Sequence, residues 1–236
     1  MRSNFNLVLV LIWLLMFGIW LFPGFAGAMG GPVPKAQPVG YLIDNFESGN
    51  FGVNPAWWVF DKISPEAVST TGLLDGDPLV AREAGKYSLL IKGATRTEWY
   101  AGGMGVYFAR PGQDLSQYRN LQMDIYGFGP GQGTLKIELY DDDNNNWDLE
   151  QNTMEAYAPL YDDRFAAELT VDWMGWKRVV IPFANLKDEN AGVGDDFWNP
   201  VQGGKSGGLL QMQFICISSR KIGTLQYAVD NIRLTK

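Results

Sequence analysis

Short stretches that alternate apolar and polar residues recur along most of the chain. Eight of them stand at residues 41–46, 86–92, 121–126, 134–140, 165–171, 176–183, 210–218 and 225–234. A period of two indicates β-strands, and the segments between them are rich in Gly, Pro, Asp and Asn. No stretch keeps a helical period for three turns. The pattern therefore predicts an all-β fold, an antiparallel β-sandwich, without an internal repeat or a second domain.

The polar positions of several predicted strands fall on one side of each strand. In the strand at 121–126 this side carries Gln122, Asp124 and Tyr126. The equivalent sides of two other strands carry Lys136, Glu138, Tyr140, Gln211 and Gln213. We therefore expect one sheet surface lined with carboxylate, amide, ammonium and phenol groups, with Tyr126 and Glu138 as candidate ligand contacts. Such a surface is either an ordinary solvated sheet face or a groove that binds sugar.

The N-terminal segment has the pattern of a signal peptide. Arg2 precedes an apolar run from Leu7 to Phe22, and Ala26-Gly27-Ala28 follows as a small-x-small cleavage site. The alternative is an uncleaved anchor, but the run is shorter than the ~20 residues that span a bilayer. We therefore predict a signal peptide at 1–28, a Pro/Gly-rich leader at 29–40 and one domain at 41–236. The mature protein is then secreted, periplasmic or at the cell surface, with no stable membrane span after cleavage.

Composition removes several classes of function. The chain has no histidine and one cysteine, which excludes Ser-His-Asp relays, imidazole metal sites, intramolecular disulfides and CxxC pairs. With 19 Lys+Arg against 26 Asp+Glu the net charge is −7, which disfavours nucleic acid as a partner. The lone Cys216 falls on the same strand face as Met212 and Phe214, so a buried and inert thiol is expected.

Tryptophan and tyrosine also stand in predicted loops. Adjacent residues of an extended chain point to opposite sides, so Trp57-Trp58 and Trp99-Tyr100 should each keep at least one ring near the surface. Two acidic segments accompany them. The run at 141–146 fails the EF-hand spacing and favours a hairpin turn, whereas the loop at 188–200 can hold calcium, contact a sugar or be a solvated Ω-loop.

Two terminal motifs and one internal strand resemble those of a known family. Leu42-Ile-Asp-Asn-Phe-Glu47, Gly175-Trp-Lys-Arg-Val-Val-Ile-Pro-Phe183 and Tyr227-Ala-Val-Asp-Asn-Ile-Arg-Leu234 are similar to the signatures of family eleven carbohydrate-binding modules. These are jelly-roll domains with the galactose-binding-like fold. A respiratory complex I assembly-factor family of the same fold shares the Ile-Pro-Phe and Val-Asp-Asn elements.

The resemblance implies a non-catalytic module that binds a β-linked glucan or related polysaccharide in a groove on one sheet. Carried over by position, the implied contacts are Trp58, Trp99, Tyr100, Asp195, Asp196 and Trp198. The family also binds structural calcium near its chain ends, where Asp44, Glu47 and Asp230 are the matching carboxylates.

Two other functions are alternatives to sugar binding. A secreted chain with one binding domain also suits a cell-envelope interaction or scaffold module that contacts a protein on the same face. A glycoside hydrolase requires two carboxyl groups at a fixed separation, and the chain lacks an E-x-D-x-x-E strand motif that would provide them. The sequence therefore favours a carbohydrate-binding protein that is not an enzyme.

Overall fold

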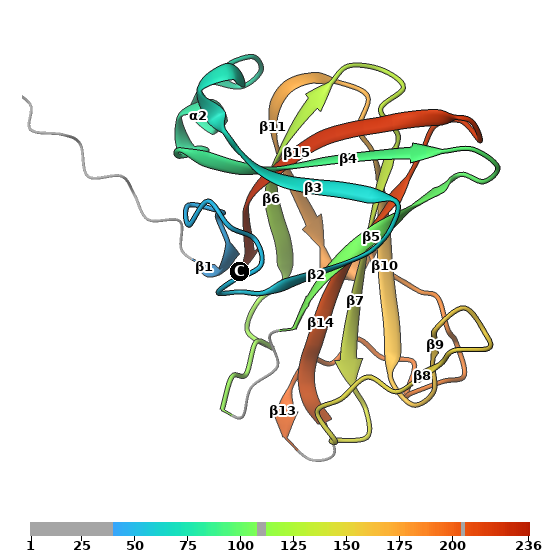
Figure 1. Cartoon of the computed structure of the whole chain (residues 1–236). Coiled ribbons are helices and arrows are strands. Elements are labelled where there is room, and N and C mark those ends of the chain that lie inside the picture. The colour runs from blue at the N-terminus through green and yellow to red at the C-terminus, as the bar shows by residue number, and fades with distance from the viewer. Residues whose placement is uncertain (1–39, 108–111, 204–205) are drawn as a thin grey trace, which may run out of the picture. The chain divides into compact units, whose positions relative to one another are not determined.

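Two antiparallel sheets pack face to face and bury the apolar sides of their strands between them (Figure 1). The computed structural model describes residues 40–107, 112–203 and 206–236. The antiparallel β-sandwich predicted from the alternating pattern is confirmed. The predicted signal peptide, and the leader up to residue 39, lie outside the described residues.

The first sheet has six strands. They are β1 (Gly40–Asp44), β3 (Ile63–Ser69), β4 (Tyr87–Thr95), β6 (Asn120–Phe128), β11 (Met174–Pro182) and β15 (Gly223–Thr235). Their order is β11-β6-β15-β4-β3, and β1 pairs with the C-terminal part of β15. The two sequence motifs at the ends of the chain are thus neighbours in this six-stranded sheet.

The second sheet has seven strands. They are β2 (Trp57–Asp61), β5 (Tyr100–Tyr107), β7 (Thr134–Asp142), β10 (Asp163–Thr170), β12 (Lys187–Asp188), β13 (Gln202–Gly203) and β14 (Ser206–Ile217). Their order is β12-β10-β7-β14-β5-β2, and β13 pairs with β14. Between β7 and β10 the chain forms a small hairpin of β8 (Gln151–Asn152) and β9 (Ala158–Pro159).

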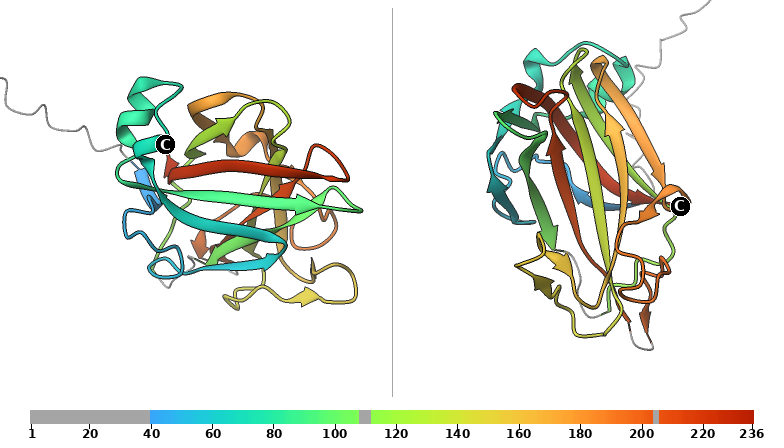
Figure 2. Two further views of the ribbon diagram at one scale, coloured as in Figure 1. Left: turned by 45° about the horizontal axis from the view of Figure 1, so that its top comes forward. Right: turned by 90° about the vertical axis from the view of Figure 1, so that its right-hand side faces the viewer.

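Three short helical segments complete the described fold: η1 (Thr70–Gly72), α2 (Pro78–Glu83) and η2 (Phe183–Asn185). Asp77 caps the N-terminus of helix α2, because its carboxylate accepts a hydrogen bond from the backbone N–H of Leu79 at 2.8 Å. Pro78 suits the first helical position, because it has no backbone N–H that would need a partner. It lies at the opposite end of the sandwich from the β8–β9 hairpin and β13 (Figures 1 and 2). Among the described residues, no helix is long and apolar enough to cross a membrane.

The core lies between the sheets and follows the predicted parity. Met123 and Ile125 of β6 face Ile137 of β7 and Phe214 of β14 within one cluster of fully buried side chains. Cys216 belongs to the same cluster and is fully buried, so the prediction of a core thiol is confirmed. Burial raises the pKa of this thiol to about 12, because the thiolate would lose its hydration.

Each of the eight predicted stretches overlaps a strand, but three further long strands (β2, β3 and β5) and four strands of two residues each (β8, β9, β12 and β13) were missed. Glycines at 102, 103 and 105 interrupt the pattern of β5, and the adjacent tryptophans obscure the alternation of β2. In β3 the presence of Pro65 argued against a strand. Proline is tolerated there because β3 is an edge strand of its sheet.

The expectation that the polar strand faces form one surface is wrong. Strand β6 belongs to the six-stranded sheet, whereas β7 and β14 belong to the seven-stranded sheet. The outer face of β6 is also covered: Tyr126 is 4% exposed and packs edge-on against Trp176 and Phe128 beneath α2. Tyr126 is therefore separated from Glu138 by the thickness of the sandwich.

Candidate functional site

The outer face of the seven-stranded sheet brings polar and aromatic side chains into rows. Strand register pairs Glu138 of β7 with Gln213 of β14, Gln213 with Gly105 of β5, and Gly105 with Trp58 of β2. All four positions face away from the core, because an adjacent residue in each strand (Ile137, Phe214, Met104 and Trp57) belongs to the core cluster. One row across the sheet thus carries a carboxylate, an amide and an indole.

Glycines in β5 allow two aromatic rings to lie on the sheet. A Cβ added at Gly105 would lie 2.3 Å from Cζ2 of Trp58, and one added at Gly103 would lie 2.4 Å from Cζ of Phe60. Trp58 also packs against the half-exposed Tyr107, with ring centroids 4.8 Å apart. The result is a partly exposed aromatic platform, of the kind that stacks on the C–H face of a sugar.

The polar groups beside this platform are held in fixed positions. Tyr140 donates its hydroxyl hydrogen to Oε2 of Glu138 at 2.6 Å, and Lys136 bridges Glu138 at 2.8 Å and Glu189. Burial lowers the pKa of Lys136, but the hydrogen bonds to the two glutamates raise it above its usual range overall. Burial, and then the charge of Glu138, raise the pKa of the Tyr140 hydroxyl. At neutral pH Lys136 is therefore charged and Tyr140 is a neutral phenol, and Glu138 and Tyr140 are both buried beneath the surface of the sheet face.

Trp99 and Tyr100 lie at the other end of β5 from Tyr107. The Trp99 side chain is 49% exposed, and its backbone oxygen accepts a hydrogen bond from the N–H of Ser218 at 2.7 Å. The Tyr100 hydroxyl donates to the Asp61 carboxylate. Since Trp57 is buried whereas Trp58 and Trp99 reach the surface, the expectation of one surface ring in each aromatic pair is confirmed.

The loop at 188–200 has a mixed structure. Trp198 is only partly buried but packs on the core edge, with ring centroids 5.5 Å from Phe165 and 5.0 Å from Phe183. The Asp195 and Asp196 carboxylates instead bind backbone N–H groups of their own loop. The structure thus places the predicted contact Trp198 inward, where it anchors this loop to the sandwich.

The acidic run at 141–146 begins inside β7 rather than forming a tight hairpin turn. Asp142 is fully buried, and its carboxylate accepts three backbone N–H groups, from Asn144, Asn145 and Trp147. This aspartate therefore has a structural role, since it folds the chain that leaves β7.

Three other aspartates meet where β7 and β10 leave the sheet. Asp141, Asp143 and Asp163 each place a carboxylate oxygen within 4.8 Å of the other two, and Asp163 forms a second such group with Asp188 and Asp196. Burial and the charges of its neighbours raise the pKa of Asp163 to about 7, and that of Asp143 to about 6. Burial raises the pKa of Asp141 well above its usual range. These residues, called the acidic cluster below, are mutually repulsive when ionised.

The carboxylates implied for calcium by the family resemblance lie near β1 and β15. Asp44 accepts hydrogen bonds from the Phe46 N–H at 2.8 Å and from the indole of Trp57 at 2.9 Å. Glu47 accepts the N–H groups of residues 86 and 87. Oδ2 of Asp230 is buried without a hydrogen bond. The pKa of Asp230 is raised to about 9, mainly by burial and further by the charges of Asp124, Glu47 and Asp44. Carboxylate oxygens suit calcium, but among the described residues these three do not form a group with oxygens within 4.8 Å of one another, so the calcium prediction here stays a prediction.

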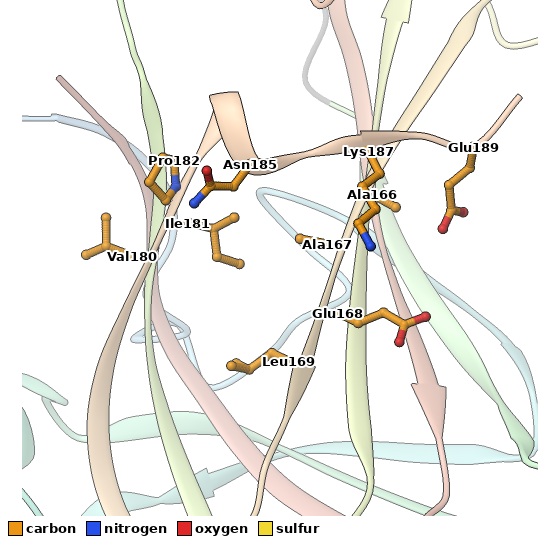
Figure 3. A pocket seen from close by; sticks show the side chains of 10 residues that line it. All are labelled: Ala166, Ala167, Glu168, Leu169, Val180, Ile181, Pro182, Asn185, Lys187 and Glu189. Atoms are coloured by element: carbon orange, nitrogen blue, oxygen red, sulfur yellow. The ribbon is translucent and has the colours of Figure 1, made fainter. Parts of the chain in front are cut away.

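A groove of about 420 Å³ lies between β10 and β11, where the edges of the two sheets separate. Figure 3 shows Leu169 and Ile181 in its walls and Lys187, Glu189 and Glu168 around them. No aromatic ring lines this groove, and none of the predicted contact residues does. It is therefore a poorer match to a sugar ring than the platform of Trp58 and Tyr107.

The architecture is an antiparallel β-sandwich, and comparison with solved structures shows which known folds it resembles. A family 11 carbohydrate-binding module from Clostridium thermocellum, solved with a β-1,3-1,4-mixed-linked tetrasaccharide, is 17% identical over 84% of this chain and 97% of its own, with a TM-score of 0.51. The family 11 module of the C. thermocellum cellulase Lic26A-Cel5E is 18% identical over 85% and 96% of the two chains, with a TM-score of 0.49. A CBM22-2 xylan-binding domain from Paenibacillus barcinonensis is 18% identical over 81% and 96%, with a TM-score of 0.42.

No protein-family model matches the sequence, and no curated protein is significantly similar to it. At sequence identities of 17–18%, the structural similarity supports a common fold and nothing more. The resemblance to family eleven that the terminal motifs predicted is thus confirmed at the level of the fold.

Several residues of the site were missed in the sequence. Tyr107 and Phe60 lie in the two strands whose alternation was not recognised. Asp163 stands two residues before a predicted strand and belongs to no recognised motif. The alternation of glycine with larger residues from 103 to 106 was an available signal, because it leaves one strand face without side chains over these residues.

Proposed function

We propose that the chain is a non-catalytic carbohydrate-binding module that binds a β-linked glucan on the outer face of the seven-stranded sheet. The observation that carries this proposal is the platform of Trp58 and Tyr107 beside the row of Gln213 and Glu138. The rings supply stacking on the sugar, and the partly exposed Gln213 amide supplies hydrogen bonds to its hydroxyl groups. Glu138 is buried and bound by Tyr140 and Lys136, so it supports the surface from below. The structural likeness to a family 11 module supports mixed-linkage glucan as the first ligand to test.

The test is calorimetric titration of the protein with mixed-linkage β-glucan, xyloglucan and cellohexaose, with calcium present. We expect saturable heat with at least one of them. Trp58→Ala should weaken this binding by roughly tenfold or more, because a central aromatic contact contributes about 2 kcal/mol. Trp99→Ala, the same substitution at a half-exposed ring at the sheet end, is the matched control.

A second matched pair separates the two sheets. Tyr107→Ala removes half of the platform, whereas Tyr87→Ala removes a similarly exposed ring on the six-stranded sheet. Loss of binding in the Tyr87 or Trp99 variant, with the platform variants unchanged, would place the glucan elsewhere. A folded protein that gives no heat with any glucan would favour the alternative, an envelope module that binds a protein partner.

The same glucans test the proposal that the chain is not an enzyme. Prolonged incubation should release no reducing ends above the level of a heat-denatured sample. Release would instead assign a carboxylate pair to hydrolysis. Secretion is tested by the N-terminus of the exported protein, which we propose begins at Met29.

A further inference from the structure

The acidic cluster buries carboxyl oxygens that lack a partner. Asp141 and Asp163 are both fully buried. Oδ1 of Asp141 and both carboxylate oxygens of Asp163 have no hydrogen bond, although the backbone of Asp195 lies near enough to Asp163 to lower its pKa slightly. No ion pair among the described residues includes a member of this cluster. Buried carboxylates normally have a partner, so these unpartnered oxygens require one.

The loop at 188–200 covers the carboxylate oxygens of the acidic cluster. Asn199 donates its backbone N–H to Oδ2 of Asp141 at 3.0 Å, and Asp188 and Asp196 bring two further carboxylates to Asp163. Gly194 approaches so closely that an added Cβ would lie 2.4 Å from Oδ2 of Asp143 and 2.5 Å from Oδ1 of Asp163. Its φ of +76° also suits glycine. The loop backbone thus encloses the carboxylates instead of leaving them to water.

The cluster also has an access route. A small hollow of about 230 Å³ is lined by Asp143, Asp195 and Asn199. A hydrated ion can therefore reach Asp143 from solvent, while Asp141 and Asp163 lie deeper.

We infer that the acidic cluster is a calcium site, in which Asp141, Asp143 and Asp163 bind the ion and Asp188 and Asp196 complete the site from the loop. Calcium accepts six to eight oxygen ligands at 2.3–2.6 Å, so oxygens that lie within 4.8 Å of one another can share one ion. Magnesium requires shorter bonds and keeps several waters, which suits an enclosed set of aspartates less well. The ion fastens the loop at 188–200 to the end of the seven-stranded sheet. This site is distinct from the carboxylates of β1 and β15.

The test uses the purified full-length chain, stripped with a chelator and then titrated calorimetrically with calcium chloride and, separately, magnesium chloride. We expect saturable calcium binding and a higher melting temperature with calcium. Asp163→Asn should weaken calcium binding by at least about tenfold, because even partners outside a coordination shell contribute about 10- to 100-fold. Without calcium this variant should melt no lower than the wild type, since it removes one repelling charge. That result also shows that the variant folds.

Two controls make the assignment specific. Asp172→Asn makes the same change at an exposed turn beyond the opposite end of β10, and should leave calcium binding unchanged. Asp230→Asn alters the carboxylates implied by the family resemblance. Absence of calcium binding by the wild type, or wild-type affinity in Asp163→Asn, would overturn the inference. So would loss of all calcium binding in Asp230→Asn alone. None of these outcomes depends on whether a glucan binds.

Discussion

The most discriminating experiment compares the stabilities of two variants, Trp99→Ala and Trp198→Ala. From the sequence, Trp99 and Trp198 are both loop rings available to a ligand, so either substitution should leave stability unchanged. In the structure Trp99 is 49% exposed, whereas Trp198 packs against Phe165 and Phe183 at the edge of the core. Only Trp198→Ala should therefore destabilise the fold.

The magnitude follows from the contacts. Each aromatic pair contributes about 0.5–1.5 kcal/mol beyond area burial, and full truncation of a buried tryptophan costs about 3–5 kcal/mol. Because Trp198 is only partly buried, we expect a loss of about 2–4 kcal/mol in the free energy of unfolding. For a folded unit of this size, that lowers the melting temperature by roughly 5–15 °C. Trp99→Ala should stay within about 0.5 kcal/mol of the wild type.

Urea unfolding followed by far-UV circular dichroism measures this difference, since tryptophan fluorescence would change with the substitution itself. Trp198→Phe is a useful companion, because it retains an aromatic ring and should recover part of the loss. Equal stability of the two alanine variants would refute the inward position of Trp198 and return it to the list of ligand contacts.

Three further predictions follow from buried groups and from the platform. Cys216 should not react with iodoacetamide at pH 8 in the folded protein, because its pKa is raised to about 12, and should react once in denaturant; rapid native labelling would contradict its burial. Asp124→Asn should lower the free energy of unfolding in urea by about 2–4 kcal/mol, because Arg178 binds this fully buried carboxylate at 2.7 and 2.9 Å. Glu83→Gln alters the exposed partner of the same arginine and should cost less than about 1 kcal/mol. Gly105→Ala should lift the indole ring from the sheet and abolish glucan binding while the protein stays folded; unchanged affinity would remove the platform from the site.

The polar row and the acidic cluster depend on pairing between strands distant in sequence. Glu138 and Trp58 share a row only because β14 and β5 lie between β7 and β2. The cluster forms because β7 and β10 run side by side in opposite directions, which brings Asp163 opposite Asp141. The intervening β8–β9 hairpin separates these two residues in the sequence, so no local motif reports their contact.

The sequence by itself determined the strands with clear alternation, the inward side of each, the buried Cys216 and the likeness of the terminal motifs to family eleven modules. These features are local, since a period of two needs only neighbouring residues to be read. The tertiary structure decided which sheet each strand joins, and hence that Tyr126 and Glu138 lie on opposite outer faces of the sandwich, where both are buried. It also decided that Trp198 packs inward and that three aspartates meet. Alternation fixes which side of a strand is apolar, but the choice of neighbouring strand depends on long-range packing of the whole core.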